Sequence, residues 1–155
     1  MMPLLLSLKP HFAELVFMGE KTVELRRRIA STMIGREVFI YVSSPVRMIR
    51  GGFRVAEVWS SDPESVWSEV ATRAGVAKAE YDAYYEGCGI AHALALSDVW
   101  AHEAPVEIEG VRRALPGFRP PQSWRYARGR ELEWLRRFKL SATAAAHAPY
   151  CPAFP

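Results

Sequence analysis

The order of the predicted secondary-structure elements is the feature that most constrains how this chain can fold. A short apolar run is followed by a helix, several strands, two helices, a long strand and a basic helix. We expect them at residues 4–8, 10–18, 22–28, 37–42, 49–59, 62–73, 78–85, 90–100 and 129–139. This order favours an α+β fold: a mixed, mostly antiparallel sheet or small β-barrel with flanking helices, not a doubly wound parallel sheet.

Glycines mark several of these boundaries. Gly19 stands where a helix that begins at Pro10 would end, because a glycine readily adopts the left-handed conformation that terminates helices. Gly51 and Gly52 stand at the start of the strand at 49–59. Glycines within a strand indicate a bulge or the close approach of another backbone.

Length and composition fit a single domain over residues 1–140. The chain has 155 residues, of which 50% are hydrophobic and 24% are charged, so it can bury a core of its own. Residues 141–155 are rich in Ala and Pro without periodicity, and we expect a poorly ordered tail there. No apolar run approaches the ~20 residues that span a bilayer. Residues 4–8 are interpreted as a buried strand rather than a signal peptide, so no membrane partner is expected.

Cysteines and histidines give no indication of a disulfide or a metal site. Cys88 and Cys151 are too few for a disulfide framework and suit a reducing, cytoplasmic location. None of the four histidines pairs with another at ligand spacing; they are His11, His92, His102 and His147. The chain also lacks a Gly-rich phosphate loop and a local Ser-His-Asp signature. We therefore expect neither a metal nor a cofactor, which disfavours a nucleotide triphosphatase or a metallohydrolase.

Charge is distributed unevenly along the chain. Residues 1–59 hold nine Lys/Arg against five Asp/Glu, residues 60–110 two against ten, and residues 111–155 nine against two. Sixteen of the twenty basic residues are Arg, whose planar guanidinium suits phosphates and stacked bases. The pattern fits either solvated faces that balance one another or a surface that faces a polyanion.

Four polar residues follow the predicted helix end and alternate with apolar ones. Thr22, Glu24 and Arg26 share one face of the predicted strand, and Lys21 lies at the corner, where a bulge could turn it the same way. A solvent-facing strand with an ion pair would explain this pattern. A binding pocket would also explain it, because a carboxylate accepts from a base amine while Lys and Arg donate to carbonyl or phosphate oxygens. In a catalytic site the carboxylate would activate water and Lys21 would stabilise an oxyanion.

Three further segments carry polar groups suited to nucleic acid. The triplet at 26–28 is either a solvated turn or a phosphate-contacting rim. Ser43 and Ser44 form either a plain turn or an anion contact. The segment at 120–126 is either a rigid loop over a sheet edge or a base-reading surface, and its candidate contact residues are Gln122, Ser123 and Tyr126.

The chain resembles the ASCH domain family. The run from Gly19 to Arg26 matches the family signature G-x-K-x-x-E-x-R, and it is preceded by Leu6-Ser7-Leu8-Lys9-Pro10. The segments at 41–45 and 120–123 resemble the bacterial and archaeal branch that is often labelled as transcriptional regulators. The resemblance implies a PUA-like β-barrel whose cleft is lined by the signature residues, with Lys9 among the binding residues, and it implies RNA or nucleoside ligands.

Within this family, some proteins hydrolyse N4-acetylcytidine and related acylated cytidines, and others are reported as ribonucleases. In the amidohydrolase branch the run reads K-T-x-T-x-R, and Lys activates the second Thr. Here Lys21 matches the Lys, but Glu24 stands at the nucleophile position. Amide hydrolysis would then use Glu24 to activate water. An assisting Glu is also implied, for which Glu57 and Glu69 are candidates.

Three functions follow as hypotheses. The first is a small amidohydrolase that acts on N4-acylated cytidine-type nucleosides, with Lys21 and Glu24 as catalytic residues and Arg26 orienting the substrate. The second is a non-catalytic RNA or modified-base binding protein. The third is a ribonuclease, although no His stands near the signature to act as general acid or base. The sequence indicates no particular oligomeric state.

Overall fold

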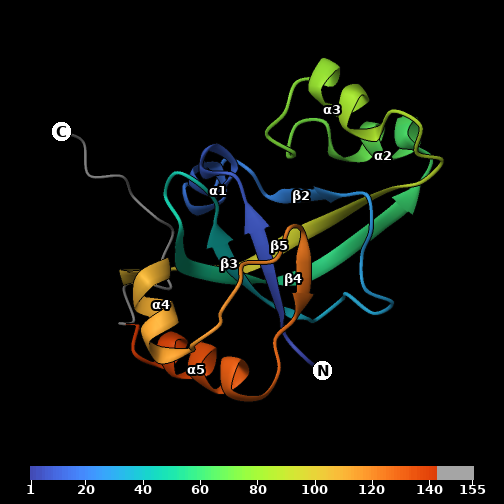
Figure 1. Ribbon diagram of the computed structural model, residues 1–155. Helices are drawn as coiled ribbons and strands as arrows, with labels where there is room; N and C mark the ends of the chain where they lie inside the picture. Colours follow the sequence, from blue (N-terminus) through green and yellow to red (C-terminus); the bar gives the residue numbers. More distant parts are fainter. Residues whose placement is uncertain (143–155) are drawn as a thin grey trace.

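The computed structural model describes residues 1–142 as one curled sheet with helices around it (Figure 1). The strands are β1 (Leu4–Leu8), β2 (Val23–Arg26), β3 (Glu37–Val42), β4 (Met48–Ser61), β5 (Ala91–Glu107) and β6 (Trp124–Tyr126). The helices are α1 (Pro10–Phe17), α2 (Pro63–Val70), α3 (Lys78–Tyr85), α4 (Ile108–Ala114) and α5 (Gly129–Leu140). The nine expected elements occur in the expected order, and the chain also forms α4 and β6. The tail that was expected to be poorly ordered falls, from residue 143 onward, outside the described residues.

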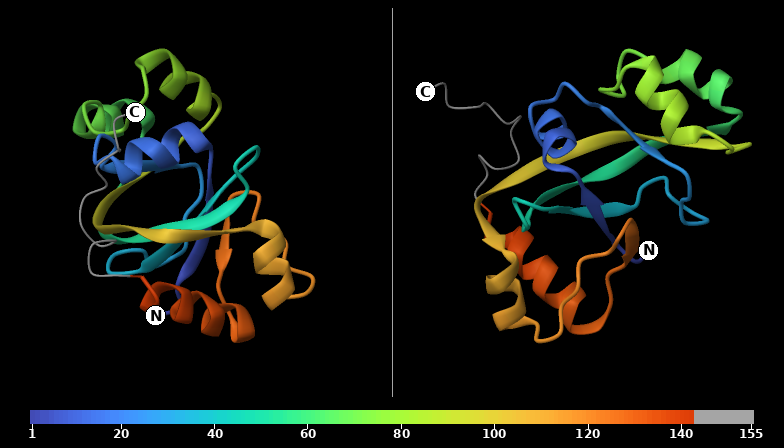
Figure 2. Two further views of the ribbon diagram at one scale, coloured as in Figure 1. Left: turned by 90° about the vertical axis from the view of Figure 1, so that its left-hand side faces the viewer. Right: turned by 45° about the horizontal axis from the view of Figure 1, so that its top comes forward.

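The six strands form one sheet in the order β2-β5-β4-β3-β1-β6. β1 pairs with β3 in parallel, and the other four pairings are antiparallel. The sheet curls into a half-barrel, with β2 at one edge and β6 at the other (Figures 1 and 2). The prediction of an α+β fold with a mixed, mostly antiparallel, barrel-like sheet is therefore confirmed.

Both faces of the sheet are buried, because side chains alternate along its central strands. In β1, Leu4, Leu6 and Leu8 join one hydrophobic cluster, which includes α1, while Leu5 joins a second cluster with α4 and α5. A third cluster holds α2 and α3 against β2 and the start of β5. Each fully buried Leu stabilises the fold by about 1.5–3 kcal/mol relative to an exposed one.

Gly51 allows β4 to approach β5 closely, and Gly52 allows β4 to approach β3 closely. A Cβ at Gly51 would lie 2.0 Å from the Trp100 carbonyl oxygen, and one at Gly52 would lie 2.4 Å from the Val38 carbonyl oxygen. The pairing of β4 with β5 also shifts register on either side of this glycine pair. The close approach predicted from the sequence is confirmed.

Several element boundaries differ from the predictions. The strand predicted for 22–28 covers only Val23–Arg26, and the helix predicted for 62–73 ends at Val70. β5 was expected to end at residue 100 but continues through Pro105 to Glu107. The register between β4 and β5 shifts in this stretch. A proline is tolerated at such a bulge because the residue there does not have to donate a hydrogen bond to the neighbouring strand.

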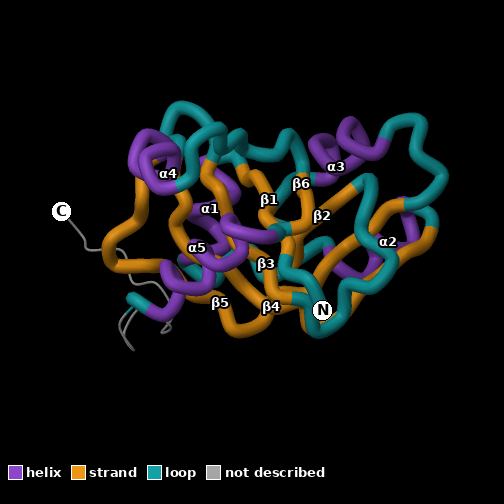
Figure 3. Tube along the Cα trace, turned by 60° about the horizontal axis from the view of Figure 1, so that its bottom comes forward, coloured by secondary structure: helices purple, strands orange, loops and turns teal. Residues whose placement is uncertain are grey.

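Within residues 1–142, no helix is both long enough and apolar enough to cross a membrane. The tube view shows instead that each helix is short and packs beside the strands (Figure 3). The β6 edge lies next to β1 on the side toward α3, and the loop that leads into it comes from α4. This arrangement brings the loop before β6 to the end of the signature strand β2, where Ser123 contacts Arg26 and Trp124 contacts Arg28.

Candidate nucleic-acid site

The end of α1 places Lys21 beside the signature strand. Gly19 adopts φ 79°, and the amides of Glu20 and Lys21 both donate to the Leu15 carbonyl oxygen, at 3.0 and 2.9 Å. These bonds satisfy a carbonyl that the helix end would leave free. The chain therefore turns sharply, and Lys21 enters the interior without the strand bulge that the sequence suggested, since the pairing of β2 with β5 has no register shift.

Lys21 and Glu24 form a buried ion pair. Their exposed fractions are 3% and 5%, and Lys21 Nζ lies 3.6 Å from Glu24 Oε2. Lys21 Nζ also donates a hydrogen bond to the Ala74 carbonyl oxygen, in the turn after α2. Burial lowers the pKa of Lys21, and the neighbouring Glu24 carboxylate opposes this effect because it favours the charged ammonium.

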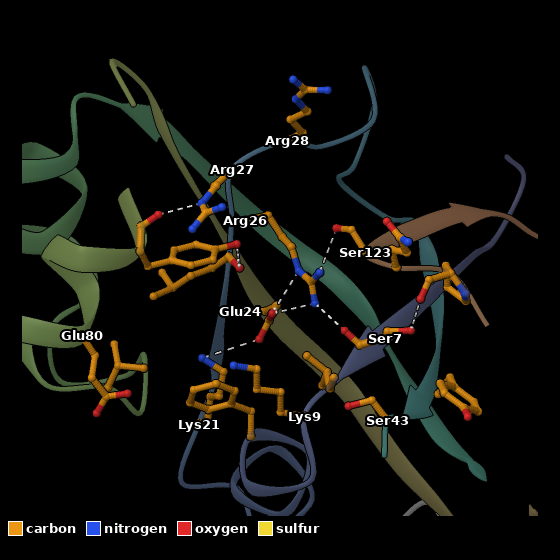
Figure 4. Close-up of a pocket in the computed structure, with 18 of the residues that line it drawn as sticks. Ser7, Lys9, Lys21, Glu24, Arg26, Arg27, Arg28, Ser43, Glu80 and Ser123 are labelled. Atoms are coloured by element: carbon orange, nitrogen blue, oxygen red, sulfur yellow. Dashed lines mark hydrogen bonds and ion pairs between the residues drawn. The ribbon is translucent and has the colours of Figure 1, made fainter. Parts of the chain in front are cut away.

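Arg26 connects three segments that are far apart in the sequence. Its Nε and Nη2 both contact Glu24 Oε1, at 3.0 and 2.9 Å. Its Nη1 donates to Ser123 Oγ at 3.1 Å, and its Nη2 donates to the Ser7 carbonyl oxygen at 2.9 Å (Figure 4). Glu24 Oε1 therefore accepts two contacts from Arg26, while Glu24 Oε2 lies 3.6 Å from Lys21 Nζ.

A cavity of about 1130 Å³, called the cleft below, opens beside this network. Its walls come from β1, α1, β2, β3, α3 and the loop before β6. Polar and aromatic side chains line it together with a few aliphatic ones, and we count among them Ser7, Lys9, Phe12, Lys21, Glu24, Arg26, Arg27, Arg28, Tyr41, Ser43, Glu80, Tyr84, Gln122 and Ser123. The signature residues thus face a space large enough for a ligand.

Exposed cations surround the mouth of the cleft. Lys9 reaches toward Lys21 and Glu24 from the start of α1, and Arg28 points away from them toward the other end of the opening (Figure 4). Arg27 stacks on the ring of Tyr84 at 4.4 Å, and its Nε donates to the Tyr84 carbonyl oxygen at 2.7 Å. Exposed cations of this kind attract a phosphate backbone.

The structure brings seven of the predicted site residues to the cleft. They are Lys9, Lys21, Glu24, Arg26, Ser43, Gln122 and Ser123. Thr22 does not line the cleft, because it is exposed at the corner before β2. Ser44 is exposed in the turn after β3. Tyr126 lies on the other side of β6, where its ring contacts Arg36 and Arg128.

The α3 wall of the cleft was not identified from the sequence. Glu80 and Tyr84 line the cleft, and neither is among the site residues predicted from the sequence. Burial raises the pKa of Tyr84, so its hydroxyl stays protonated at neutral pH. Glu57 and Glu69, proposed as assisting carboxylates, are both exposed and lie outside the cleft. Glu80 is the second carboxylate that the fold places there.

Within residues 1–142, no group of three or more His, Cys, Asp or Glu side chains is arranged to hold a metal ion. The three histidines of this part of the chain also do not line the cleft. The polar side chains that line the cleft carry ammonium, guanidinium, carboxylate, hydroxyl and amide groups.

A family model described as the ASCH domain matches residues 6–100. The chain belongs to the ASCH domain family. This confirms the resemblance drawn from the signature run, and the matched region includes α1, the signature residues and the α3 wall of the cleft.

Relatives of this ASCH protein include one named as an enzyme. A protein of Zymomonas mobilis named ASCH domain-containing ribonuclease is 31% identical over 134 residues, which cover 85% of this chain and 83% of that protein. The crystal structure of ASCH from Zymomonas mobilis has a TM-score of 0.80 at 30% identity, covering 87% and 94% of the two chains. Large ribosomal subunit protein uL22 of Ureaplasma parvum is 30% identical over 106 residues, 68% of this chain and 34% of that protein.

Proposed function

We propose that this ASCH domain binds single-stranded RNA in the cleft and cleaves its phosphodiester backbone. One observation carries the proposal: a buried, fixed Lys21–Glu24–Arg26 network opens onto a cleft whose mouth is ringed by exposed cations. The network supplies groups for chemistry, and the cations supply contacts to phosphates. The ribonuclease name of the Zymomonas mobilis relative supports the same reaction class.

The size of the cleft favours a segment of a polymer over a free nucleoside. Its volume of about 1130 Å³ exceeds the roughly 300–1,000 Å³ of typical small-molecule pockets. The stacked pair of Arg27 and Tyr84 offers a planar guanidinium at the mouth, and unpaired RNA bases stack on such groups. A duplex would keep its bases stacked inside, so single-stranded RNA is the better ligand.

For RNA cleavage, Glu24 Oε2 would accept the proton of a ribose 2′-hydroxyl, whose oxygen then forms a bond to the adjacent phosphorus. Lys21 and Arg26 would stabilise the negative charge that develops on the phosphoryl oxygens. The bond from phosphorus to the 5′ oxygen breaks, and Lys9 would donate the proton that this leaving oxygen needs. The products are a 2′,3′-cyclic phosphate and a 5′-hydroxyl end.

The test is cleavage of a fluorogenic DNA oligonucleotide that contains a single ribonucleotide. We expect cleavage at that position by the wild-type protein, and loss of about 100-fold or more in the Lys21→Met and Glu24→Gln variants, because each removes a group that acts on the transition state. Glu57→Gln, at an exposed glutamate outside the cleft, is the matched control and should keep full activity. Equal cleavage by all variants, or cleavage of a substrate without a 2′-hydroxyl, would contradict the proposal.

A second candidate is amide hydrolysis of N4-acylated cytidine-type nucleosides. The buried pair of Lys21 and Glu24 favours it, because Glu24 Oε2 can take a proton from water while Lys21 stabilises the oxyanion formed on the acyl carbonyl. The carbon–nitrogen bond then breaks, and the departing amine takes the proton. The absorbance change of N4-acetylcytidine reports this reaction. Absence of turnover, or full turnover by Lys21→Ala, would exclude it.

The third possibility is a non-catalytic binding protein, which would bind RNA without cleaving it. Its affinity should fall steeply with salt, because each Lys or Arg contact to a phosphate releases a counterion. The Lys21→Met variant separates the cases: it would abolish cleavage in an enzyme, whereas in a pure binder it would lower affinity alone.

A further inference from the structure

Seven exposed arginines lie on α4, on the loop between α4 and β6, on α5 and at the residue just before α5, and we call this surface the arginine face. They are Arg112, Arg113, Arg119, Arg128, Arg130, Arg136 and Arg137. The elements that carry this surface hold three acidic residues, Glu109, Glu131 and Glu133. Each is already paired, with Arg112, Arg125 and Arg137 respectively. The arginine face therefore keeps a large excess of positive charge.

Most of these arginines form no ion pair within the described part of the chain. Arg113, Arg119, Arg130 and Arg136 have neither an acidic partner nor a side-chain hydrogen bond among residues 1–142. Arg128 contacts the Tyr126 ring but has no acidic partner in the same range. Exposed arginines without acidic partners leave an excess of positive charge on this surface, which an external polyanion would neutralise.

The arginine face runs directly into the cleft. Arg119 is adjacent in sequence to Pro120, which lines the cleft. Two hydrogen bonds hold the loop between α4 and β6 in place. Arg125 Nη2 donates to the Arg119 carbonyl oxygen at 2.9 Å, and Arg112 Nε donates to the Phe118 carbonyl oxygen at 3.3 Å. The loop extends from α4 to β6 along one side of the molecule (Figure 3). α4 and α5 pack into the same hydrophobic cluster, so they lie side by side.

The opposite end of the molecule has the opposite charge. α2 and α3 lie at the far end from α4 and α5 (Figures 1 and 2), and their exposed acidic residues are Glu64, Glu69, Glu80 and Asp82. Glu64 and Asp82 share one cation, Lys78, so the pair of helices keeps an excess of negative charge. A polyanion that leaves the cleft is repelled by one end and attracted by the other. The charge distribution therefore favours a polyanion that leaves the cleft toward α4 and α5.

We propose that the arginine face is a second nucleic-acid-binding surface, on which RNA held in the cleft continues after it passes Arg119. This inference rests on the proposed function of the cleft and adds the polymer length and the direction of its path. The contacts are to phosphates and not to base edges, because unpaired guanidinium groups on an exposed surface bind the backbone. RNA longer than the cleft therefore binds more tightly than short RNA, without added sequence preference.

The test compares short and long RNA by fluorescence anisotropy over a range of salt concentrations. The probes are 2′-O-methyl oligonucleotides of about four and about twenty nucleotides, which the proposed cleavage cannot consume because the 2′-hydroxyl is blocked. The variant is Arg113→Gln/Arg119→Gln. The matched control is Arg54→Gln/Arg73→Gln, which removes two charges outside the arginine face and the cleft.

We expect the variant to bind the long probe about tenfold more weakly at low salt and with a salt slope smaller by about one to two, because two phosphate contacts are lost. The variant should bind the short probe with wild-type affinity. The control should bind both probes with wild-type affinity. Long-probe binding by the variant that matches wild type would overturn the inference, as would wild-type affinity that does not rise with length, and both results leave the cleft function intact. Wild type that binds neither probe would overturn the inference and RNA binding in the cleft together.

Discussion

The buried network of the cleft contains one more cation than anions. Lys21 and Arg26 both face the single carboxylate of Glu24, and the exposed fractions of the three side chains are below one tenth. Two cations that share one carboxylate in a poorly hydrated site attract a further anion. A phosphate or a developing oxyanion would complete the balance, which is why the arrangement suits substrate chemistry better than a structural ion pair does.

The first prediction concerns the titration of Lys21. Burial lowers its pKa from 10.5, and Glu24 raises it part of the way back, so Glu24→Gln should lower the pKa further. Lys78 provides an internal reference, because hydrogen bonds to Asp82 and Glu64 raise its pKa. NMR of lysine labelled at its side-chain carbons should show Lys21 titrating below Lys78. A Lys21 pKa that is unchanged or higher in Glu24→Gln would contradict this account.

The same shift makes stability depend on pH. The unfolded chain binds a proton at Lys21 up to about pH 10.5, whereas the folded chain releases it at lower pH. Between these two pKa values the unfolded state holds more protons, so the free energy of unfolding rises with pH. Urea unfolding from neutral pH to pH 10.5 should show this rise in wild type relative to Lys21→Met. A difference between the two proteins that is constant across that range would refute it.

Arg26 is predicted to contribute to stability through geometry as well as charge. Arg26→Lys keeps the charge but loses the forked contacts to Ser7 and Ser123. We expect a loss of about 1–3 kcal/mol, because the buried Glu24 carboxylate also loses one of its two contacts with the guanidinium. Arg28→Lys, at the exposed mouth of the cleft, should stay within about 0.5 kcal/mol of wild type. Urea unfolding measures both, and equal stabilities would show that charge alone matters.

At the level of elements, the sequence predicted those helices and strands whose positions follow from local residue patterns. Alternation identified the signature strand β2, and the glycine stop located the end of α1, so the signature residues could be placed before the structure was known. The α3 wall of the cleft could not be predicted in the same way. Only the packing of α2 and α3 against β2 and β5 brings Glu80 and Tyr84 to the cleft. Pro105 misled the prediction of β5 because the bulge that tolerates a proline depends on pairing with β4.

The close approach of β4 to β5 at Gly51 gives a prediction for this strand pair. Gly51→Ala should destabilise the protein by about 1–3 kcal/mol or more, because its Cβ would clash with the Trp100 carbonyl oxygen and backbone has to move. Gly89→Ala is the matched control, since a Cβ there meets no atom within 4 Å. Thermal unfolding of the two variants measures the difference. Equal transition temperatures would mean that β4 adjusts without cost.

For the whole molecule, the cleft lies where the three hydrophobic clusters meet. Leu8 belongs to the first cluster, Tyr41 to the second and Tyr81 to the third, and all three side chains line the cleft. A ligand that touches opposite walls therefore ties together parts that otherwise contact each other mainly through the sheet. Regions of a protein open locally with different free energies, and a ligand stabilises the closed form of those that it contacts.

Hydrogen exchange should report this linkage. A short 2′-O-methyl RNA that fills only the cleft is expected to slow amide exchange in α3 and in the loop at 118–123, which form facing walls. Exchange in α5 should stay unchanged, because α5 packs on the other face of the sheet and lines no part of the cleft. Mass spectrometry of the free and bound protein measures all three segments at once. Slower exchange in α5 with no change in α3 would place the short RNA outside the cleft.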